Sequence, residues 1–587
     1  MDIFWNLDDL YTSFESSEFL TDFSNVGQEI ADISAWAAEN FASLENAGEK
    51  LTTYINKTNN SKTFAKMSMY AMLVRSVEDG NELAKKYSDL LRAKFAELAA
   101  PNVLFKAYVG RVADLDGLIA AHPTLKEHEF ILKEIKAQNA FLLSEKEEIL
   151  FAKMKNTGSN AWNDMKEQLC ANMRISVEVE GEQKVLPLPA VRNLAFDANA
   201  ETRKNAYFAE LAAYEQVDKA VAASLNAIKG EVLTNVALRG YDSPQHMTLV
   251  NARMQPETLD ALISSMEDFL PSFRRFFKKK AEILGHTNGL PWFDIFAPVG
   301  EVKLKFTYQE AADFVLENFY TFSSKMGDFT KAAFDKNWVD ATVREGKRGG
   351  AFCMNIHSIG QSRIMLNFDG SFSNVTTMAH EFGHAYHGDC LKNATYMNSH
   401  YSMPIAETAS TFCETIITDA ALAKADDATK MAILEQDISD AMQVIIDIYS
   451  RYLFETRLFE KRKGGPLSVE EINNLMLQAQ KDAYGDALDA QHLHKYMWIN
   501  KPHYYYAERN FYNFPYAYGL MFAGGLYAQY LEEGDSFLEK YDNLLAATGS
   551  ASLEDVGNLA GIDVTKKDFW TSALKRIEKK VDEFCKF

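Results

Sequence analysis

Five consecutive residues carry the strongest chemical signal in the chain: His380-Glu381-Phe382-Gly383-His384. On an α-helix, residues four apart project from the same face, so the two imidazoles can bind one metal ion. Neutral imidazoles suit Zn²⁺, and a glutamate beside them can take a proton from a metal-bound water. Such a water is a hydroxide-like nucleophile at neutral pH, which amide hydrolysis requires. The pattern therefore predicts the metal site of a zinc peptidase.

The neighbouring residues predict a helix around this motif, with Asn374 as its N-cap and Gly388 as its stop. Apolar residues recur at helical spacing between these two positions, and the histidines fall mainly off that apolar stripe. A histidine pair that only filled a core would share the apolar face instead. Taken alone, however, the pentapeptide is short and also occurs by chance in proteins that bind no metal.

A third ligand is expected from a second predicted helix, at residues 402–414, which has Pro404 near its first turn. Glu407 and Glu414 are seven residues apart and share a face of this helix. We expect Glu407 to complete a His₂Glu set with an open position for water, which is typical of catalytic zinc. Glu414 would then hydrogen-bond a ligand imidazole. The alternative is a pair of solvated glutamates, but the helix is otherwise apolar.

The longer metzincin motif is excluded by two residues. That motif needs glycine at position 387 and histidine at position 390, where this chain has His387 and Cys390. His387 remains a minor candidate for a substitute ligand or an outer hydrogen-bonding group.

Several segments together resemble oligoendopeptidase F, one of the thimet-oligopeptidase-like zinc metallopeptidases. The matching segments are residues 5–11, 349–353, 364–368, 380–387, 406–410 and the aromatic run that begins at His503. The resemblance spans almost the whole chain. It implies a mostly α fold, a large helical ellipsoid with a deep substrate channel, and cleavage restricted to short peptides.

The resemblance also implies that hydrogen-bond donors for the oxyanion lie in the aromatic run, where His503 and Tyr512 match best and Tyr516 next. The expected mechanism uses one Zn²⁺ per chain, held by His380, His384 and Glu407. Glu381 would act as general base and then as general acid. His503 and a tyrosine would stabilise the tetrahedral intermediate. Most of the other rings in this run are expected to be core residues.

Two segments alternate between apolar and polar residues as strands do. Residues 174–180 predict a β-hairpin that turns at Gly181, and residues 349–368 predict strands just before the metal helix. An edge strand beside the metal would let a substrate backbone pair with it. We expect an N-terminal helical lobe at 1–190, which ends in the hairpin, and a catalytic domain at 191–587.

The composition limits the classes of molecule that the protein is expected to bind. Asp and Glu number 82 against 61 Lys and Arg, for a net charge of −21, which argues against nucleic acid and anionic membranes as partners. The five cysteines are scattered without C-x-x-C spacing, and acidic residues stand where a signal peptide would be basic. We therefore expect a cytoplasmic protein, and the resemblance implies that it acts on oligopeptides. The sequence does not indicate its oligomeric state.

Two other functions remain open. A zinc carboxypeptidase would need a cation for the C-terminal carboxylate of its substrate, and Arg363 or Lys501 could serve. A helical peptide-binding protein with a degenerate metal site is the more distant alternative, although a binder has no use for Glu381. Product masses would distinguish the first alternative, and chelator-sensitive turnover the second.

Overall fold

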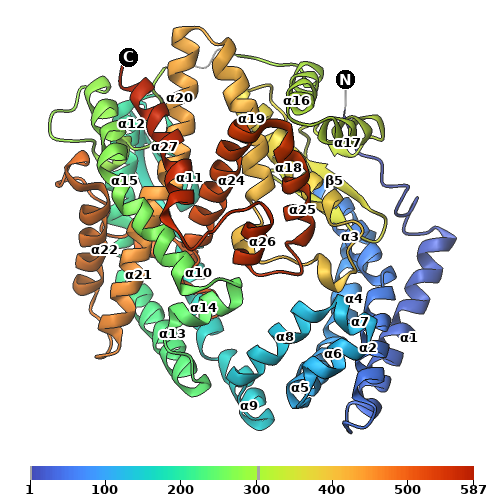
Figure 1. The fold of residues 1–587 in the computed structure, drawn as a ribbon. Coiled ribbons are helices and arrows are strands. Elements are labelled where there is room, and N and C mark those ends of the chain that lie inside the picture. Colours follow the sequence, from blue (N-terminus) through green and yellow to red (C-terminus); the bar gives the residue numbers. More distant parts are fainter. Residues whose placement is uncertain (1–2, 301–303) are drawn as a thin grey trace. The chain divides into compact units, whose positions relative to one another are not determined.

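The computed structural model describes residues 3–300 and 304–587, and these residues form twenty-seven α-helices and five short strands (Figure 1). The prediction of a mostly helical fold with small sheets is confirmed. The described residues group into two compact units, each built from three separate segments. The first unit takes its residues from 1–140, 304–420 and 529–562, and the second from 141–303, 421–528 and 563–587.

The first unit contains the predicted metal helix. Its helices are α1 Ser17–Asn40, α2 Ala47–Asn60, α3 Thr63–Val77, α4 Glu82–Glu97, α5 Ala99–Arg111, α6 Leu115–Ala121, α7 Pro123–Glu127, α8 Glu129–Gln138, α16 Tyr308–Phe322, α17 Ser324–Asp335, α18 Phe372–Cys390, α25 Leu538–Ala547 and α26 Leu553–Leu559. Two further helices, α19 Thr408–Lys424 and α24 Phe514–Glu533, contribute residues to both units.

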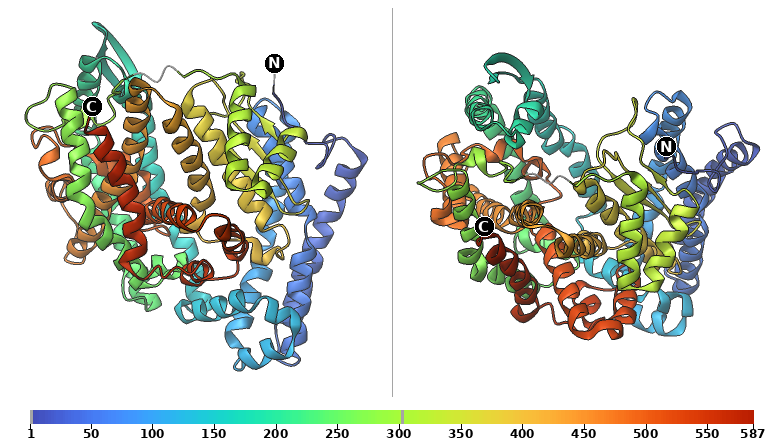
Figure 2. Two further views of the ribbon diagram at one scale, coloured as in Figure 1. Left: turned by 45° about the horizontal axis from the view of Figure 1, so that its top comes forward. Right: turned by 90° about the horizontal axis from the view of Figure 1, so that it is seen from above.

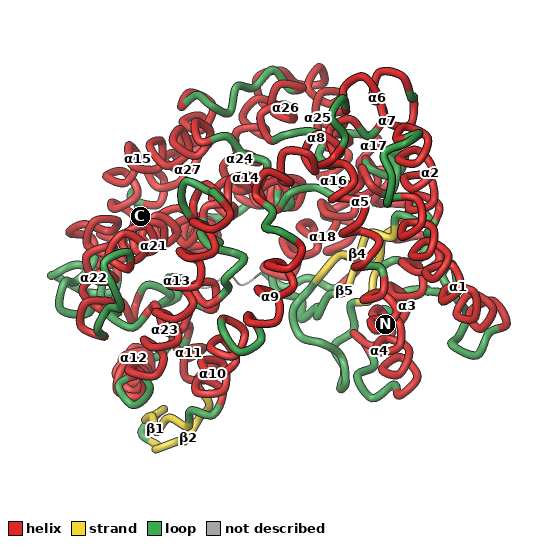
Figure 3. The backbone as a smooth tube through the Cα atoms, turned by 90° about the horizontal axis from the view of Figure 1, so that it is seen from below, coloured by secondary structure: helices red, strands yellow, loops and turns green. Residues whose placement is uncertain are grey.

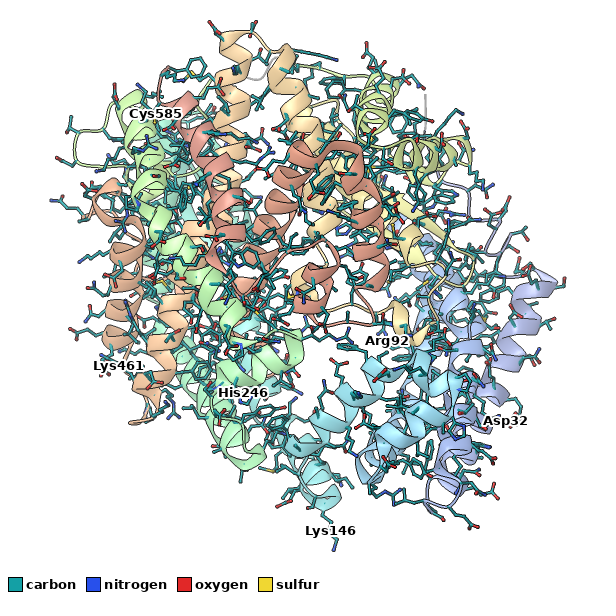
Figure 4. The ribbon with its side chains drawn as sticks, viewed as in Figure 1. Asp32, Arg92, Lys146, His246, Lys461 and Cys585 are labelled. Atoms are coloured by element: carbon teal, nitrogen blue, oxygen red, sulfur yellow. The ribbon has the colours of Figure 1, made fainter. Side chains whose placement is uncertain are left out.

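Aromatic clusters form much of the core between the N-terminal helices. In one cluster, Phe41 packs against Tyr54 and Tyr108, with ring centroids 5.2 and 4.5 Å away. In a second, Phe14 and Phe19 meet edge to face, 5.1 Å apart. Charged side chains on the outer faces of these helices, such as Asp32 and Arg92, point into solvent (Figure 4). This separation of apolar and charged faces is what fixes amphipathic helices against a common core.

A three-stranded sheet lies beside the metal helix in the first unit. Its strands are β3 Val339–Asp340, β4 Phe352–Ile356 and β5 Gln361–Met365, in the order β3-β5-β4. β4 and β5 form an antiparallel hairpin in which Cys353 pairs with Ile364, whereas β3 runs parallel to β5. Both hairpin strands pack against α18, as Figure 3 shows. The predicted strands at 349–368 are confirmed, and β4 is an edge strand of this sheet.

The second unit is also largely helical. Its helices are α9 Glu145–Lys155, α10 Ser159–Ala171, α11 Leu188–Asn193, α12 Ala200–Tyr214, α13 Asp218–Arg239, α14 Pro244–Ala252, α15 Pro256–Ile283, α20 Asp427–Met442, α21 Ile448–Arg462, α22 Val469–Tyr484, α23 Met497–Asn500 and α27 Lys567–Phe584. A π-helical segment, η6 Gln443–Asp447, joins α20 to α21. Strands β1 Arg174–Val179 and β2 Glu182–Pro187 form the predicted hairpin, which projects from the neighbouring helices (Figure 2).

The compact units are interleaved along the chain, because each draws on three segments. The division at residues 1–190 and 191–587 stays a prediction. Among the described residues, no helix combines the length and apolar character needed to cross a membrane. The uncharged stretch at 511–531 falls largely in α24, most of whose side chains are buried.

Candidate metal centre

Helix α18 carries the His-Glu-x-x-His motif. It begins at Phe372, and the hydroxyl of Ser371 accepts a hydrogen bond from the backbone N–H of Asn374 as its cap. The predicted cap, Asn374, is therefore wrong, because its side chain accepts from the backbone N–H of Asp369 instead. The predicted stop at Gly388 is also wrong, since the helix continues to Cys390.

The glycine at 388 has a packing role inside the helix. A Cβ atom there would lie 2.4 Å from the side chain of Asn355 on β4. The same asparagine donates a hydrogen bond of 3.0 Å from its side-chain amide to the carbonyl of His384. The absence of a side chain at Gly388 therefore lets β4 approach the helix at the level of the second histidine.

His380, His384 and Glu407 come together as the sequence predicts. The Nε2 atoms of the two histidines are 3.1 Å apart, and each lies 3.3 Å from Oε2 of Glu407. In a tetrahedral site the ligand atoms are separated by about 1.6 times the metal–ligand distance, so this triangle fits an ion about 2.0 Å from each atom. The three donors therefore fit a zinc-sized ion, and in the described residues they form the one His/Cys/Asp/Glu group with metal-binding spacing.

Glu407 is the residue just before α19, which begins at Thr408. The second predicted helix begins later than expected, at Thr408, after a 3₁₀ turn at Met403–Ile405. The carbonyl of Glu407 accepts a hydrogen bond of 3.0 Å from the N–H of Thr411, so the residue is fixed at the helix entrance. The hydroxyl of Ser410 lies 2.9 Å from its carboxylate.

Gly383 lets the two ligand-bearing helices meet. A Cβ atom at this position would lie 2.4 Å from the carbonyl oxygen of Ala409 and 2.5 Å from the Cα of Ser410. Any side chain would therefore collide with the backbone of α19. Neither the pentapeptide nor its spacing indicates this contact, because it depends on how the helices pack.

Glu414 has the outer role that the sequence predicts for it. Its carboxylate accepts a hydrogen bond from Nδ1 of His380, and Nε2 of the same ring faces His384 and Glu407. Burial lowers the pKa of His380, but hydrogen bonds with Glu407 and Glu414 outweigh burial and raise it to about 10. The carboxylates therefore make this site strongly attractive to positive charge.

The two glutamates nearest the histidines have opposite pKa shifts. Burial raises the pKa of Glu381 above its usual value, against the effect of His380 and His384. Burial also acts to raise the pKa of Glu407, but its hydrogen bonds with the two histidines outweigh this and hold the pKa well below its usual range. The carboxylate of Glu381 is buried, and its Oε2 atom has no protein hydrogen-bond partner. These differences suit a proton acceptor in Glu381 and an anionic ligand in Glu407.

His387 lies outside the metal-binding group. Its Nε2 is 2.8 Å from the hydroxyl of Thr548, and its ring stacks on Tyr401 with a centroid distance of 4.2 Å. Burial, followed by the charge of His384, lowers its pKa to about 3. His387 is thus a buried neutral histidine that holds α18 against neighbouring segments of the same unit.

The aromatic run belongs to the second unit, whereas the metal-binding group belongs to the first. His503 lies against Tyr512 and Tyr516, with ring centroids 5.0 and 6.1 Å away. The two tyrosine rings are 5.7 Å apart. Burial, followed by the charges of Arg451 and Lys501, lowers the pKa of His503 to about 4, which keeps the imidazole neutral at neutral pH. The structure therefore groups the three predicted oxyanion donors with one another.

A buried ion pair holds the loop that carries Tyr512. The ammonium of Lys229 lies 2.7 Å from the carboxylate of Glu455 and donates a second bond of 3.0 Å to the side chain of Asn510. The other carboxylate oxygen of Glu455 accepts from the backbone N–H of Phe511, at 3.0 Å, and from the side chain of Asn513, at 3.3 Å. Phe511 has a left-handed φ of 52°. The sequence pattern does not mark Lys229 or Glu455 as site residues, since its one signal is a charged residue among apolar ones on a helix.

The two cations considered for a carboxypeptidase differ in surroundings. Arg363 is completely buried, and its guanidinium donates to the carbonyl of Asn6 and forms an ion pair with Asp9. It is therefore committed to holding the N-terminal segment, and the prediction that it could bind a substrate carboxylate is wrong. Lys501 lines a cavity in the second unit.

Two family models together match most of the chain. Residues 193–576 match the family model described as peptidase family M3, and residues 112–175 match the model described as oligopeptidase F. The chain belongs to peptidase family M3. It is accordingly a metallo-oligopeptidase, and the expected relationship to oligoendopeptidase F is confirmed.

Relatives in the M3 family extend over most of the chain. Oligopeptidase PepF of Bacillus subtilis is 25% identical over 99% of this chain and 86% of its own length. Group B oligopeptidase PepB of Streptococcus agalactiae is 26% identical over 89% of this chain and 87% of its own length.

Solved structures share the M3 fold. A structure from Chlamydophila abortus matches with a TM-score of 0.86 at 21% identity, covering 99% of this chain and 98% of its own. Oligoendopeptidase-F from Enterococcus faecium matches with a TM-score of 0.70 at 19% identity, covering 96% of this chain and 98% of its own. At these identities the structural likeness establishes the fold alone.

Proposed function

We propose that this M3 peptidase is a zinc-dependent endopeptidase that hydrolyses internal bonds of short, unstructured oligopeptides. The observation that carries the proposal is the triangle of His380, His384 and Glu407, whose sides are 3.1–3.3 Å. Zinc bound there would supply a Lewis acid that lowers the pKa of a water molecule. A cytoplasmic location of the protein is part of the proposal and is supported by five scattered cysteines without C-x-x-C spacing.

Glu381 is the proposed general base. Its helix position beside His380 and its raised pKa suit a carboxylate that takes a proton from water and returns it to the leaving amine. Glu414 is proposed to fix the tautomer of His380, and Gly383 to hold Glu407 within reach of both histidines. In the second unit, His503 and Tyr512 are the proposed donors to the oxyanion, with Tyr516 as the next candidate.

The substrate backbone is proposed to add to β4. This strand is an edge of its sheet, packs on α18, and reaches the second histidine through Asn355. Pairing along a strand edge uses main-chain hydrogen bonds, so it binds peptides with little dependence on side chains. An extended, unstructured substrate is required for such pairing.

The test is mass spectrometry of digests of unstructured peptides graded in length, with intact casein alongside. Glu381→Gln should retain the metal and lose nearly all turnover. Glu317→Gln, which changes an exposed glutamate on α16, should behave as wild type. Internal cuts in short peptides, abolished by chelation and restored by zinc, support the proposal. Stepwise loss of C-terminal residues would indicate a carboxypeptidase, and metal binding without any cleavage would indicate a peptide-binding protein. Wild-type rates in Glu381→Gln would refute the assigned base.

A further inference from the structure

A cavity of about 270 Å³ lies within the second unit, and none of the proposed catalytic residues lines it. Its walls come from α11, α12, α15, the 3₁₀ turn Trp292–Asp294, η6 and the segment around α23. The volume is close to the lower limit of ordinary small-molecule sites. A ligand of one or two amino-acid residues would therefore be of suitable size.

Aromatic side chains supply the apolar part of this cavity. The rings that line it are Phe196, Tyr207, Phe277, Trp292, Phe293, Phe296 and Tyr484. Such a lining favours a ligand with an aromatic or large apolar body, because burial of that body removes apolar surface from water.

Buried polar atoms in the same cavity have no hydrogen-bond partner within the protein. Both ring nitrogens of His494 and the side-chain oxygen of Asn500 are buried without a hydrogen-bond partner. His494 is only 1% exposed, and its Nε2 is 3.6 Å from the carboxylate of Glu210, too far for a hydrogen bond. Because buried polar atoms are nearly always paired, a polar ligand or ordered water is needed here.

The charges around Lys501 favour an anion. Its ammonium lies 3.9 Å from the carboxylate of Asp447, which already pairs with Arg451 at 2.5 Å. Arg192 and Glu210 are the other charged groups that act on it, and they lie 3.5 Å from each other. Burial, followed by the charge of Arg451, lowers the pKa of Lys501 to about 8. Lys501 is thus a partly buried cation, 21% exposed, and its nearest anion, Asp447, is shared with Arg451.

The backbone of one wall is unusual. Gln443 and Asp447 line the cavity from η6, the π-helical segment between α20 and α21. π-helical turns are rare and occur frequently at functional sites. This feature is independent of the polar atoms and charges described above.

We propose that this cavity binds a small carboxylate with an aromatic or large apolar body, the chemistry shared by a free apolar amino acid and the C-terminal residue of a peptide. Lys501 pairs with the carboxylate, and His494 and Asn500 bond the remaining polar atoms of the ligand. The aromatic walls enclose its apolar body. This assignment does not depend on the proposed metal centre.

The experiment is calorimetric titration of the metal-loaded protein with 3-phenylpropionate, with the uncharged 3-phenylpropanamide as the matched probe. The amide is expected to bind at least about tenfold more weakly, because it lacks the charge that pairs with Lys501. Lys501→Met should weaken binding of the carboxylate by a similar factor. Lys495→Met removes a neighbouring lysine that does not line the cavity, and should bind as wild type.

A second variant tests the cavity by filling it. Ala195→Trp places a large side chain at a residue that lines it, and binding of 3-phenylpropionate should be lost. Thermal melting of both variants establishes that they are folded. Carboxylate binding that survives both Lys501→Met and Ala195→Trp would place the ligand elsewhere, including at the metal, and would overturn the proposal. Absence of binding by folded wild type at millimolar ligand would also overturn it.

The two natural sources of this chemistry are compared with L-phenylalanine and N-acetyl-glycyl-L-phenylalanine. Binding of the free amino acid alone supports an amino-acid site, and binding of the acylated dipeptide supports a site for peptide C-termini. In either case Lys501→Met must weaken the interaction. Glu381→Gln should bind all probes as wild type does, so a failed peptidase proposal and a failed cavity proposal give different results.

Discussion

Glu455→Gln is expected to lower the free energy of unfolding by about 3–5 kcal/mol, the usual cost of removing one partner of a buried ion pair. The side chains of Lys229 and Glu455 are 0% and 2% exposed, and their charged atoms are 2.7 Å apart. Glutamine keeps the size of the side chain but leaves Lys229 without an anion. Burial already lowers the pKa of Lys229, and Glu455 is the group that opposes this.

The loop before α24 should respond together with the ion pair. The side-chain oxygen of the glutamine introduced by Glu455→Gln can still accept a hydrogen bond from Phe511 or Asn513. Its amide nitrogen is a donor, however, so it cannot accept a hydrogen bond from Lys229 or from these two residues. For a large protein, about 2 °C of melting temperature corresponds to each kcal/mol, so a decrease of about 6–10 °C is expected. Differential scanning calorimetry would measure the shift, and peptidase activity of the folded variant should also fall because Tyr512 lies in this loop.

The matched control is Glu460→Gln, on the same helix. Glu460 and its partner Lys463 are 65% and 54% exposed, so their ion pair should contribute less than about 1 kcal/mol. In the double variant Lys229→Met/Glu455→Gln, the loss should be smaller than the sum of the two single losses by about 2 kcal/mol or more. A Glu455→Gln melting temperature indistinguishable from that of Glu460→Gln would refute this account of the buried pair.

Three further perturbations test the metal centre and its neighbours. Gly383→Ala should destabilise the protein by about 1–3 kcal/mol and weaken metal binding, because the new Cβ collides with the backbone at Ala409. The metal content after dialysis against a weak chelator measures this effect. A metal content equal to that of wild type would contradict the prediction. Glu414→Gln should reduce metal affinity by about 10–100-fold, because His380 would be oriented less firmly. Competition with a chromophoric chelator would measure the affinity. An unchanged affinity would show that Glu414 does not support the metal site. The pKa of His503 is about 4 in the folded protein and about 6.5 in the unfolded chain. Between about pH 6.5 and pH 4 the unfolded chain therefore binds a proton at this residue that the folded protein does not bind. Acidification through this range should lower the free energy of unfolding by at most about 3 kcal/mol. His503→Gln should show a shallower loss from pH 6.5 to 4 in urea unfolding, and a slope equal to that of wild type would count against the pKa.

The part of the site that could be predicted from the sequence is the part fixed by local geometry. Helical spacing alone predicts that His380 and His384 share a face, and the seven-residue interval predicts that Glu407 and Glu414 do so. The strand alternation at 174–180 reflects one buried face of a hairpin in the same way. For the two histidines and the hairpin, the relevant distance is set within a few residues of backbone. Glu407 lies just before α19, and its place at the helix entrance preserves the relation to Glu414.

The part that could not be predicted depends on contacts between distant segments. Asn374 has the residue type of a helix cap, yet Ser371 takes that role because the loop uses the Asn374 side chain at Asp369. Gly388 has the residue type of a helix stop, yet it is needed for the approach of Asn355. Arg363 reads as an available cation but is buried against the N-terminal segment. The interleaving of the two compact units likewise has no local signal.

That interleaving has a consequence for synthesis of the protein. The first unit takes residues from 1–140, 304–420 and 529–562, so its sheet and the metal helix α18 leave the ribosome long after its N-terminal helices. The N-terminal helices share one core formed by residues 33–135. Their second core also uses Met354 and Ile356 of β4, so part of its apolar surface stays exposed, and prone to aggregate, until β4 has emerged. We therefore expect nascent chains to rely on chaperones until β4 has emerged, and slow codons placed between residues 140 and 304 to give little benefit to the yield of folded enzyme.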